Sequence, residues 1–380
     1  MAEPLVTRRG ILPVPSFLPD ATRAGVRGVT SEDLRGVGVE ALVVNAFHLL
    51  RRPGARLIRA AGGIHAFMDW SGPVLSDSGG FQVWSLIRQD PARGVIRDRE
   101  VIFREPSTGE KWNLTPERVI GLQFQLGGDV MVCLDDCTDA EAPLAEQARS
   151  VERTVAWARR SREAFDRLAS ERRDGPTPLL FAVVQGGGSE ELRRDCAARL
   201  AEIGFDGYGF GGWPLAADGS LLTDPLHWVA ETLPPSAPKH ALGIGRPDHV
   251  VSAFALGYSL FDCALPTRDA RHGRLYAFRT GYPARGVRPG AAFFRAIHIL
   301  DARYRVDQAP LEEGCDCPAC AHYSRAYVHH LFKVGDASAE RLATLHNLRF
   351  YVRLFEALRP GLRSARSLSP DGADGPRSRG

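Results

Sequence analysis

The sequence predicts an α/β fold, a (β/α)8 TIM barrel with a C-terminal zinc-binding subdomain. Eight short apolar segments, each suited to be a buried strand, occur along the chain with amphipathic helical stretches between several of them. A cluster of three cysteines follows the last of these segments, and a histidine lies one predicted helix further on. The alternative architecture for the apolar segments is a doubly wound open sheet.

The predicted strands are apolar runs of three to six residues, at residues 16–18, 41–44, 74–76, 130–134, 179–184, 208–210, 241–244 and 259–261. Between them, helices are predicted at residues 148–170 and 190–203, and a shorter polar helix from Ser31. In the second long helix Leu192, Cys196, Leu200 and Ile203 share one face, as in a helix that packs on a sheet.

A polar residue or a glycine follows directly on almost every predicted strand. These residues are Asn45, Asp77, Asp135, Gln185, Gly211, Gly212, Gly245 and Asp262. Barrel enzymes collect their active-site groups at the carboxyl ends of the strands, so these residues are expected to meet at one rim.

Cys315, Cys317 and Cys320 account for three of the chain's seven cysteines within six positions, which indicates a metal site. With His346, on a helix predicted at residues 339–358, they offer the four ligands of a closed tetrahedral Zn²⁺ site with a structural role. His322, His329 and His330 are alternative fourth ligands, and three reduced cysteines in a tight turn are the alternative to a metal. A zinc-dependent hydrolase is not favoured, because four protein ligands leave the metal no open position.

The composition is that of a globular protein with a large core: 380 residues, 44% hydrophobic and 24% charged, with a net charge of +3. No run approaches the roughly 18 apolar residues that cross a bilayer, and the first residues resemble neither a signal nor a transit peptide. A cytoplasmic protein without a membrane partner is expected. Residues 1–300 are predicted to form the barrel, 301–360 the zinc subdomain and 361–380 a disordered tail rich in Ser, Pro, Gly and Arg.

The stretch from Arg268 to Arg295 is rich in arginine. Because Tyr276, Phe278 and Tyr282 are interleaved with the arginines, the stretch fits a groove for a phosphate backbone. A solvated arginine-rich surface is the alternative interpretation.

Two of the strand-end residues are carboxylates in glycine- or proline-rich turns, Asp77 in residues 76–82 and Asp262 in residues 260–268. Two carboxylates that face one pocket are what a retaining double displacement at a sugar carbon needs, since one attacks and the other moves protons. Either aspartate alone would more often be a helix cap or a salt-bridge partner. Together they favour glycosyl transfer.

Seven motifs in order along nearly the whole chain resemble those of the tRNA-guanine transglycosylases, which exchange a guanine base in tRNA for a 7-deazaguanine. They are residues 45–49 (NAFHL) with 52–54 (RPG), 77–82 (DSGGFQ), 135–138 (DDCT), 184–187 (VQGG), 211–212 (GG), 261–268 (FDCALPTR), and Cys315, Cys317 and Cys320 with His346.

The resemblance implies roles for residues at matching positions. Asp262 would be the nucleophile that forms a covalent ribosyl-enzyme intermediate, and Asp77 the general acid and base. The remaining implied roles are base recognition by Asp135, Gln185 and the Gly212 N–H, stacking by Phe81, and RNA contact by Arg246, Arg268 and Arg271. The implied partners are the anticodon loop of a tRNA, a 7-deazaguanine and a second copy of the chain in a homodimer.

The chain departs from the bacterial pattern after Gly212, where Ala217 stands at the position of a Glu tied to the aminomethyl-deazaguanine substrate. Asp218 is next to it, and Trp213 replaces a Leu beside the base. The expectation is that queuine is accepted at least as well as the aminomethyl base. A DNA-directed deazaguanine transglycosylase and a non-catalytic RNA-binding subunit are the alternative functions.

Overall fold

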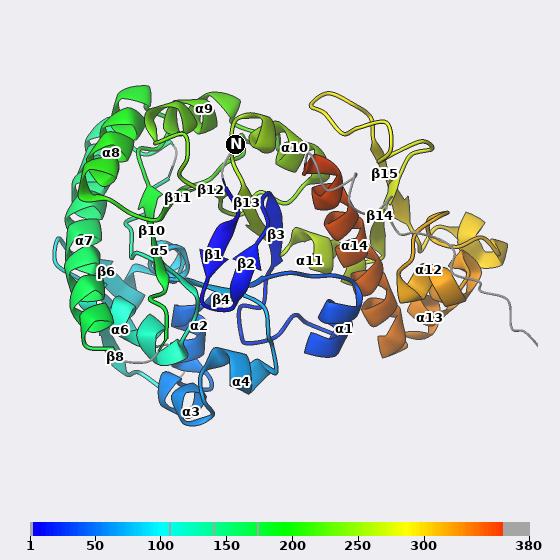
Figure 1. The fold of residues 1–380 in the computed structure, drawn as a ribbon, viewed down its shortest axis with the longest axis horizontal. Helices are drawn as coiled ribbons and strands as arrows, with labels where there is room; N and C mark the ends of the chain where they lie inside the picture. Colours follow the sequence, from blue (N-terminus) through cyan, green and yellow to red (C-terminus); the bar gives the residue numbers. More distant parts are fainter. Residues whose placement is uncertain (1–2, 106–107, 140, 173–174, 360–380) are drawn as a thin grey trace, which may run out of the picture.

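The computed structural model describes residues 3–105, 108–139, 141–172 and 175–359. Eight parallel strands form one sheet, and Figure 1 shows them curved into a barrel with helices outside it. In chain order the strands are β3 (Ser16–Pro19), β4 (Leu42–Asn45), β5 (Val74–Asp77), β9 (Val130–Val132), β10 (Leu179–Val184), β11 (Gly207–Phe210), β12 (Lys239–Ala241) and β13 (Leu260–Cys263).

From β4 to β13 each strand pairs with the next one along the chain, and β13 pairs with β3 over four residues. A parallel bridge between Asp20 and Val43 joins the end of β3 to β4. The sheet therefore returns on itself as a barrel, and the alternative of an open doubly wound sheet is wrong.

Seven of the eight predicted strands overlap the observed strands as mainly apolar, buried runs, and the prediction for the seventh strand in chain order meets β12 only at Ala241. The seventh differs most from the prediction, since β12 covers Lys239–Ala241 rather than residues 241–244. The strand β12 was misplaced because two of its residues are polar and break the apolar pattern. Lys239 is buried with its ammonium donating to the Pro234 carbonyl at 3.1 Å, and His240 is buried beside it. Gly243, with φ +74°, turns the chain out of the strand.

Helices follow the strands and pack their apolar faces on the barrel. They are α1 (Ser31–Gly36), α2 (Ala46–Arg51), α3 (Ala55–Ala60), α4 (Ile64–Met68), α5 (Gly80–Gln89), α6 (Pro116–Leu126), α7 (Leu144–Ser170), α8 (Glu190–Ile203), α9 (Thr223–Thr232), α10 (Pro247–Ala255) and α11 (Leu265–Arg271). The prediction for α8 is confirmed at both ends, and α7 begins four residues earlier than predicted.

Two small antiparallel sheets interrupt this pattern. A hairpin of β1 (Leu5–Thr7) and β2 (Gly10–Leu12) precedes the barrel, and its Leu5 and Leu12 join the interior cluster. After α5, a 3-10 turn η1 (Pro91–Arg93) leads into β6 (Gly94–Ile96), β7 (Val101–Arg104) and β8 (Lys111–Leu114).

The C-terminal part begins with a hairpin of β14 (Arg274–Phe278) and β15 (Phe294–His298). It continues with η2 (Ala302–Val306), α12 (Pro318–His322), α13 (Arg325–Val334) and α14 (Ala337–Leu358). Figure 1 shows α14 lying between the barrel and the α12–α13 region. The division at residue 300 stays a prediction, and the predicted tail at 361–380 lies outside the described residues.

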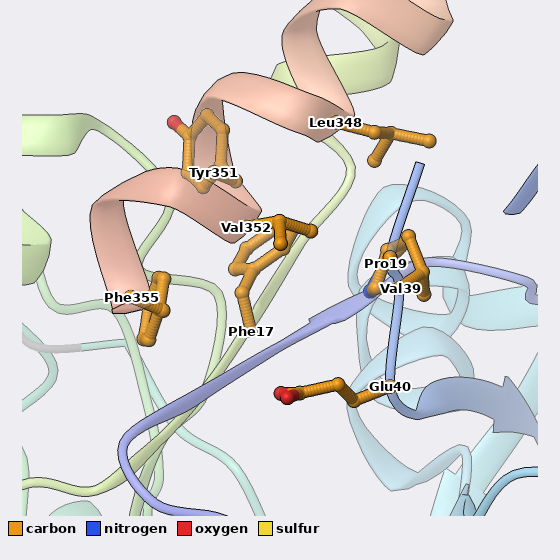
Figure 2. A pocket seen from close by; sticks show the side chains of 9 residues that line it. Phe17, Pro19, Val39, Glu40, Leu348, Tyr351, Val352 and Phe355 are labelled. Carbon is orange, nitrogen blue, oxygen red and sulfur yellow. The ribbon is translucent and has the colours of Figure 1, made fainter. Parts of the chain in front are cut away.

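Helix α14 packs directly on the first barrel strand. The rings of Tyr351 and Phe355 lie 4.6 Å and 6.0 Å from the ring of Phe17, centroid to centroid. A gap of about 10 Å³ lies beside these rings and has room for no more than about one water molecule. Figure 2 shows its lining side chains, which include Glu40 and Leu348. This gap is therefore a packing defect and not a ligand site. No helix in the described ranges is both long and apolar enough to span a bilayer.

Candidate active site and metal centre

The structure brings the strand-end residues of β4 and β5 together, with Asn45 and Asp77 directly opposite in the strand register. The Asn45 Nδ2 donates to Asp77 Oδ2 at 2.6 Å and to Gln82 Oε1 at 2.9 Å. Its Oδ1 accepts from the His48 N–H at 3.1 Å and so caps α2. Asn45 therefore fixes the Asp77 carboxyl group and the start of a helix at once.

Asp77 sits among other acids. Burial, together with the negative charges of Asp135 and Asp262, raises the pKa of Asp77 to about 7. A carboxyl group with this pKa exists in both protonation states near neutral pH, as a general acid and base must. Asp77 therefore lies close enough to Asp135 and Asp262 for their charges to act on its carboxyl group.

Asp262 at the end of β13 is partly exposed, with 20% of its side chain accessible to solvent. Its Oδ1 lies 2.8 Å from the Nε2 of His240 on β12 and accepts from the Gly243 N–H at 3.3 Å. One carboxylate oxygen is thus held by the neighbouring strand. His240 was not among the predicted site residues, because those polar groups follow the strands and this histidine lies inside one.

Asp135 and Gln185 form a pair across β9 and β10. The Gln185 Nε2 donates to Asp135 Oδ2 at 2.7 Å, and burial raises the pKa of Asp135 to about 6. Glycines make room for both groups, since a Cβ on Gly80 would lie 3.1 Å from Asp135 Oδ1 and one on Gly211 2.5 Å from Gln185 Nε2. The two glycines therefore allow the chain to pass close to a carboxylate and an amide that face the site.

Aromatic rings stand beside these polar groups. Phe81 is 39% and Trp213 57% exposed, and their rings are nearly parallel, at 22° with centroids 6.5 Å apart. They line a groove of about 470 Å³ with Trp84, Arg88 and other residues of α5 and the loop after β9. Exposed aromatic faces at an acidic rim suit a flat heterocyclic ring.

Two of the arginines that were predicted to contact RNA lie on one helix. Arg268 and Arg271 lie in α11, and burial and the positive charges of Arg27 and Arg268 lower the pKa of Arg271. Arg27, which comes from the loop before α1, was not among the predicted residues. Arg246 is 2.8 Å from Asp248, so its charge is shared with a neighbouring acid.

The interleaved aromatic residues do not belong to this surface. Tyr276 and Phe278 are only 1% and 6% exposed, and both pack against Phe350 of α14. The prediction that Tyr276 and Phe278 line a backbone groove is wrong, because residues 275–278 of β14 are all buried.

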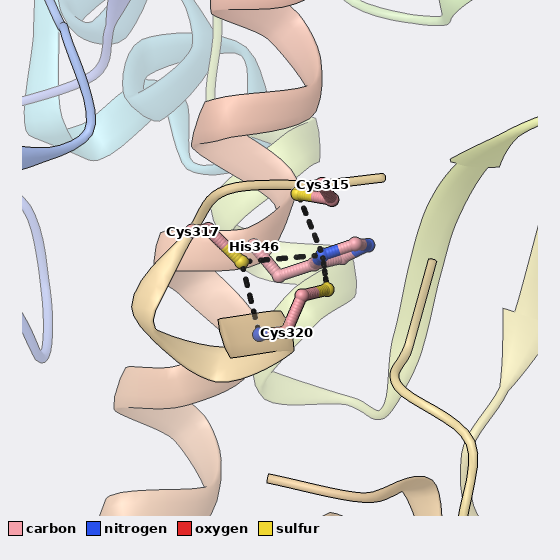
Figure 3. Close-up of side chains that lie close together, drawn as sticks. All are labelled: Cys315, Cys317, Cys320 and His346. Atoms are coloured by element: carbon pink, nitrogen blue, oxygen red, sulfur yellow. Dashed lines mark hydrogen bonds between the residues drawn. The ribbon is translucent and has the colours of Figure 1, made fainter. Parts of the chain in front are cut away.

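The metal cluster is confirmed as a geometric group. The ligand atoms of Cys315, Cys317, Cys320 and His346 all lie within 4.8 Å of one another. Figure 3 shows the three sulfurs around the His346 Nδ1, at 3.9, 3.6 and 3.3 Å in that order. A tetrahedral zinc with ordinary bond lengths sets the sulfur–nitrogen separation at about 3.6 Å, so these residues fit the ion.

The tautomer of His346 also suits a metal. Its Nε2 donates to the Tyr276 carbonyl at 2.8 Å, which leaves the Nδ1 lone pair for the cluster. The alternative ligands are excluded by position, because the His329 ring is bound to the Ile299 carbonyl at 2.7 Å and neither His322 nor His330 belongs to the cluster.

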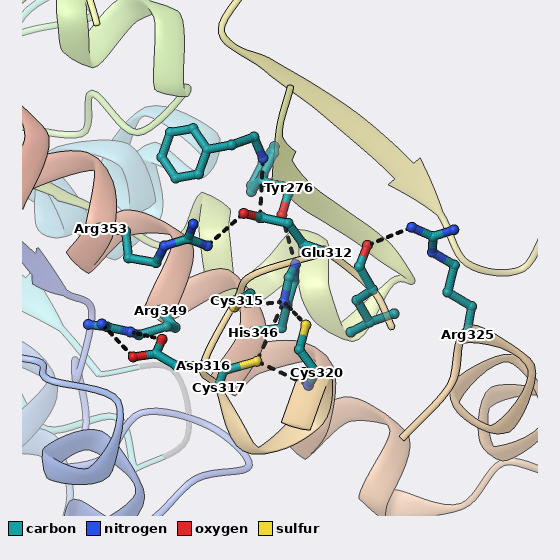
Figure 4. A network of polar contacts seen from close by, with 12 residues as sticks. Tyr276, Glu312, Cys315, Asp316, Cys317, Cys320, Arg325, His346, Arg349 and Arg353 are labelled. Carbon is teal, nitrogen blue, oxygen red and sulfur yellow. Dashed lines mark hydrogen bonds and ion pairs between the residues drawn. The ribbon is translucent and has the colours of Figure 1, made fainter. Parts of the chain in front are cut away.

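The loop that carries the cysteines is held by ion pairs to α14, which Figure 4 shows. Asp316 accepts two hydrogen bonds from Arg349, at 2.5 and 2.8 Å, and Glu312 accepts one from Arg353 at 2.6 Å. Cys317 is the N-cap of α12 and Pro318 is its first residue. The non-ligand residues of the motif therefore position the loop.

The fold is a closed parallel barrel with carboxyl groups at its rim, and a separate cluster of four residues could hold a metal ion. These features define a class of barrel enzymes in which such a metal would support the fold. A comparison with protein families gives the particular member of this class. The family described as queuine tRNA-ribosyltransferase matches residues 3–368, so the chain belongs to that family.

Individual relatives agree. The chain is 40% identical to a protein named queuine tRNA-ribosyltransferase from Shewanella halifaxensis (strain HAW-EB4), over 93% of this chain and 88% of the relative. It is 38% identical to one of that name from Thermoanaerobacter sp. (strain X514), over 96% and 90%. A third, from Actinobacillus pleuropneumoniae serotype 3 (strain JL03), is 37% identical over 94% and 87%.

Proposed function

We propose that this protein exchanges the guanine at the wobble position, position 34, of a tRNA for a 7-deazaguanine, in the formation of queuosine. Membership of the queuine tRNA-ribosyltransferase family supports the reaction class. The observation that supports the chemistry is the pair of partly exposed carboxyl groups at the ends of β5 and β13, Asp77 and Asp262.

In the proposed mechanism the free oxygen of Asp262 attacks the anomeric carbon of the guanosine as the glycosidic bond breaks. Asp77 gives the leaving guanine a proton, and a covalent ribosyl-enzyme intermediate remains. The incoming base then loses a proton to Asp77 and displaces Asp262 from the same carbon. Because one glycosidic bond replaces another, no energy source is consumed.

Base recognition is assigned to Asp135, Gln185, Gly212 and the two exposed rings. A guanine presents its ring N–H and its exocyclic amine side by side, and an ionised carboxylate can accept from both. With a pKa of about 6, Asp135 is mostly ionised at neutral pH. Phe81 and Trp213 would stack on the flipped-out base.

Zn²⁺ held by the three cysteines and His346 would have a structural role, since four protein ligands complete its shell. The ion would fix the cysteine loop against α14. The anticodon loop would dock on the arginines of α11 and on Arg246, and a homodimer is the expected assembly.

The exchange is tested with labelled guanine and separate candidate deazaguanines on either tRNA or duplex DNA, followed by nucleoside analysis. Incorporation into tRNA alone is expected. Incorporation into DNA would favour the DNA-directed alternative. A non-catalytic RNA-binding subunit would show no incorporation, and the presence of both Asp77 and Asp262 argues against it.

The preferred incoming base is a second, more specific proposal. Asp218 lies in an exposed turn, where its Oδ1 accepts from the Ser220 N–H and hydroxyl at 2.9 and 2.6 Å, and this local pairing argues against Asp218 as the acid that is missing at Ala217. A cationic aminomethyl group would thus lack its acidic partner. We propose that queuine is used at least as well as the aminomethyl base, with Trp213 beside the larger substituent.

The test of this preference is kcat/KM for queuine, the aminomethyl base and guanine on one tRNA. A hydrogen bond to a charged group is worth about 1.5–3 kcal/mol, so the loss of this bond should change kcat/KM by a measurable amount. A strong preference for the aminomethyl base over queuine would contradict the proposal and indicate another acid in the pocket.

A further inference from the structure

Arg193 of α8 is a buried cation directly behind the base-recognition residues, with only 2% of its surface exposed. Its Nε donates to the Gly187 carbonyl, and its Nη1 donates to the carbonyls of Val184 and Gly211, each at 2.9 Å. The guanidinium also lies 4.2 Å from the centre of the Phe210 ring. Burial lowers the pKa of Arg193 to about 10, so it stays charged at neutral pH.

The surroundings of this cation are unusual. Buried arginines are normally paired with a carboxylate, and no described carboxylate lies within ion-pair distance of Arg193. Backbone carbonyls of two loops compensate the charge instead. Those loops follow β10 and β11, and they carry Gln185 and Gly212.

The contact with Gly211 fixes a peptide plane. In a trans peptide the carbonyl of one residue and the N–H of the next point in opposite directions. Because the Gly211 carbonyl points inward to Arg193, the Gly212 N–H must point away from it, toward the rim. This N–H has no hydrogen-bond partner among the described residues. Gly212 has φ +86°, and a Cβ there would lie 3.3 Å from Arg193 Nη2.

We propose that Arg193 is a positioning residue for base recognition, which holds the Gly211–Gly212 peptide so that the Gly212 N–H meets the carbonyl of the bound base. The proposal rests on the proposed function and assigns the selectivity for a 6-carbonyl base to a residue outside the pocket. Arg193 acts through the peptide and does not touch the base.

The test compares equilibrium binding of free guanine and free 6-thioguanine. The thio analogue keeps the ring N–H and the amine of guanine, but sulfur, a weaker hydrogen-bond acceptor, replaces the carbonyl oxygen. Both are measured on the wild-type enzyme, Arg193→Met and Arg193→Lys. Arg194→Met is the matched control, because Arg194 is the next residue but is exposed and paired with Glu190 and Glu231.

The wild-type preference for guanine over 6-thioguanine is expected to fall by about three- to tenfold in Arg193→Met, the range of one neutral hydrogen bond. Arg193→Lys keeps the positive charge but not the planar guanidinium, so it should retain part of the preference for guanine. Arg194→Met should retain the whole preference. A general loss of packing would weaken both bases equally and leave the ratio unchanged.

An unchanged ratio in a folded Arg193 variant overturns the proposal, as does failure of both variants to fold, which would make the residue purely structural. If the wild-type enzyme itself binds both bases equally, the assignment of the Gly212 N–H to the base carbonyl fails together with Arg193's role. Absence of guanine binding to the wild type and all variants would instead count against the proposed function.

Discussion

Asp77 and Asp262 are the same residue type at the same position on two strands, but their surroundings differ. Asp77 has Asn45 on one oxygen and two acids nearby. Asp262 is partly open to the rim and is held by the Gly243 N–H with His240 alongside. In the proposed mechanism these surroundings separate the proton carrier from the nucleophile, although the two carboxyl groups are chemically identical in water.

Asp262→Asn is expected to abolish exchange and the covalent RNA adduct, because the neutral amide is far less nucleophilic than the carboxylate. Denaturing gels of enzyme mixed with tRNA measure the adduct, and Asp195→Asn in the outer helix α8 is the control. An adduct that persists in Asp262→Asn would identify another nucleophile.

Asp77→Asn is expected to retain tRNA binding and to lose most turnover, since it removes proton transfer without touching the arginine surface. Filter binding and single-turnover rates separate the two effects. Near-normal exchange by this variant would remove Asp77 from the mechanism.

The same substitution has a predicted effect on stability. The pKa of Asp77 rises from 3.8 to about 7 on folding, so the folded chain binds an extra proton between these values. Stability should therefore fall as the pH rises from 4 to 7, by up to on the order of 4 kcal/mol at about 1.4 kcal/mol per pKa unit. Asp77→Asn lacks this loss and should be the more stable protein at pH 8, with the difference shrinking toward pH 4. Urea unfolding of both proteins at the two pH values measures it, and equal pH dependence would show that Asp77 titrates normally.

At the scale of elements, α14 has two functions. One face packs Tyr351 and Phe355 on the first barrel strand, and another presents His346 to the cysteine loop. Arg349 and Arg353 on the same helix hold that loop by ion pairs. Helix α14 thus connects the cysteine cluster to the barrel directly.

Cys317→Ser is expected to lose bound zinc and to lower the melting temperature, with weaker tRNA binding as a consequence. Metal analysis of the purified protein is the first measurement. Cys133→Ser, which changes a buried thiol of the barrel wall, is the control and should keep its zinc. Full zinc content in Cys317→Ser would exclude Cys317 as a ligand.

The sequence predicts elements well where one physical signal dominates. The barrel strands are apolar runs, and the cysteine spacing leaves few alternatives to a metal. The strands β6, β7 and β8 were not predicted, because they are only partly buried and therefore form no continuous apolar run. Arg193 and His240 could not be found either, since their roles depend on carbonyls and a carboxylate that only the tertiary fold brings to them.

At the scale of the whole molecule, the candidate RNA surface combines distant parts of the chain. Arg27 precedes α1, whereas Arg268 and Arg271 lie in α11, and their like charges are close enough to affect one another. Clustered like charges destabilise a folded protein unless a partner of opposite charge compensates them. Asp20 and Glu340 act on Arg271 in the opposite direction and offset part of this charge, and a polyanion would offset more of it.

Arg268→Glu combined with Arg271→Glu is expected to weaken tRNA binding and to flatten its dependence on salt. For a single-stranded loop, each phosphate that the protein no longer neutralises removes about 0.7 from the slope of log K against log salt, hence about 1.4 for two. Arg167→Glu on the outer face of α7 is the control. An unchanged slope in the double variant would place the RNA elsewhere.

The closure of the barrel has a consequence for its synthesis on the ribosome. The first strand β3 makes its four-residue ladder with β13, more than 240 residues later in the chain, and Arg359 at the end of α14 donates to the Pro15 carbonyl at 2.9 Å. Strands β4 to β13 can pair with their neighbours as they emerge, but the partner of β3 is made last. The edge of β3 should therefore stay unpaired, and able to associate with other strands, for most of translation. Chaperones that cover such an edge would be needed until α14 has left the exit tunnel.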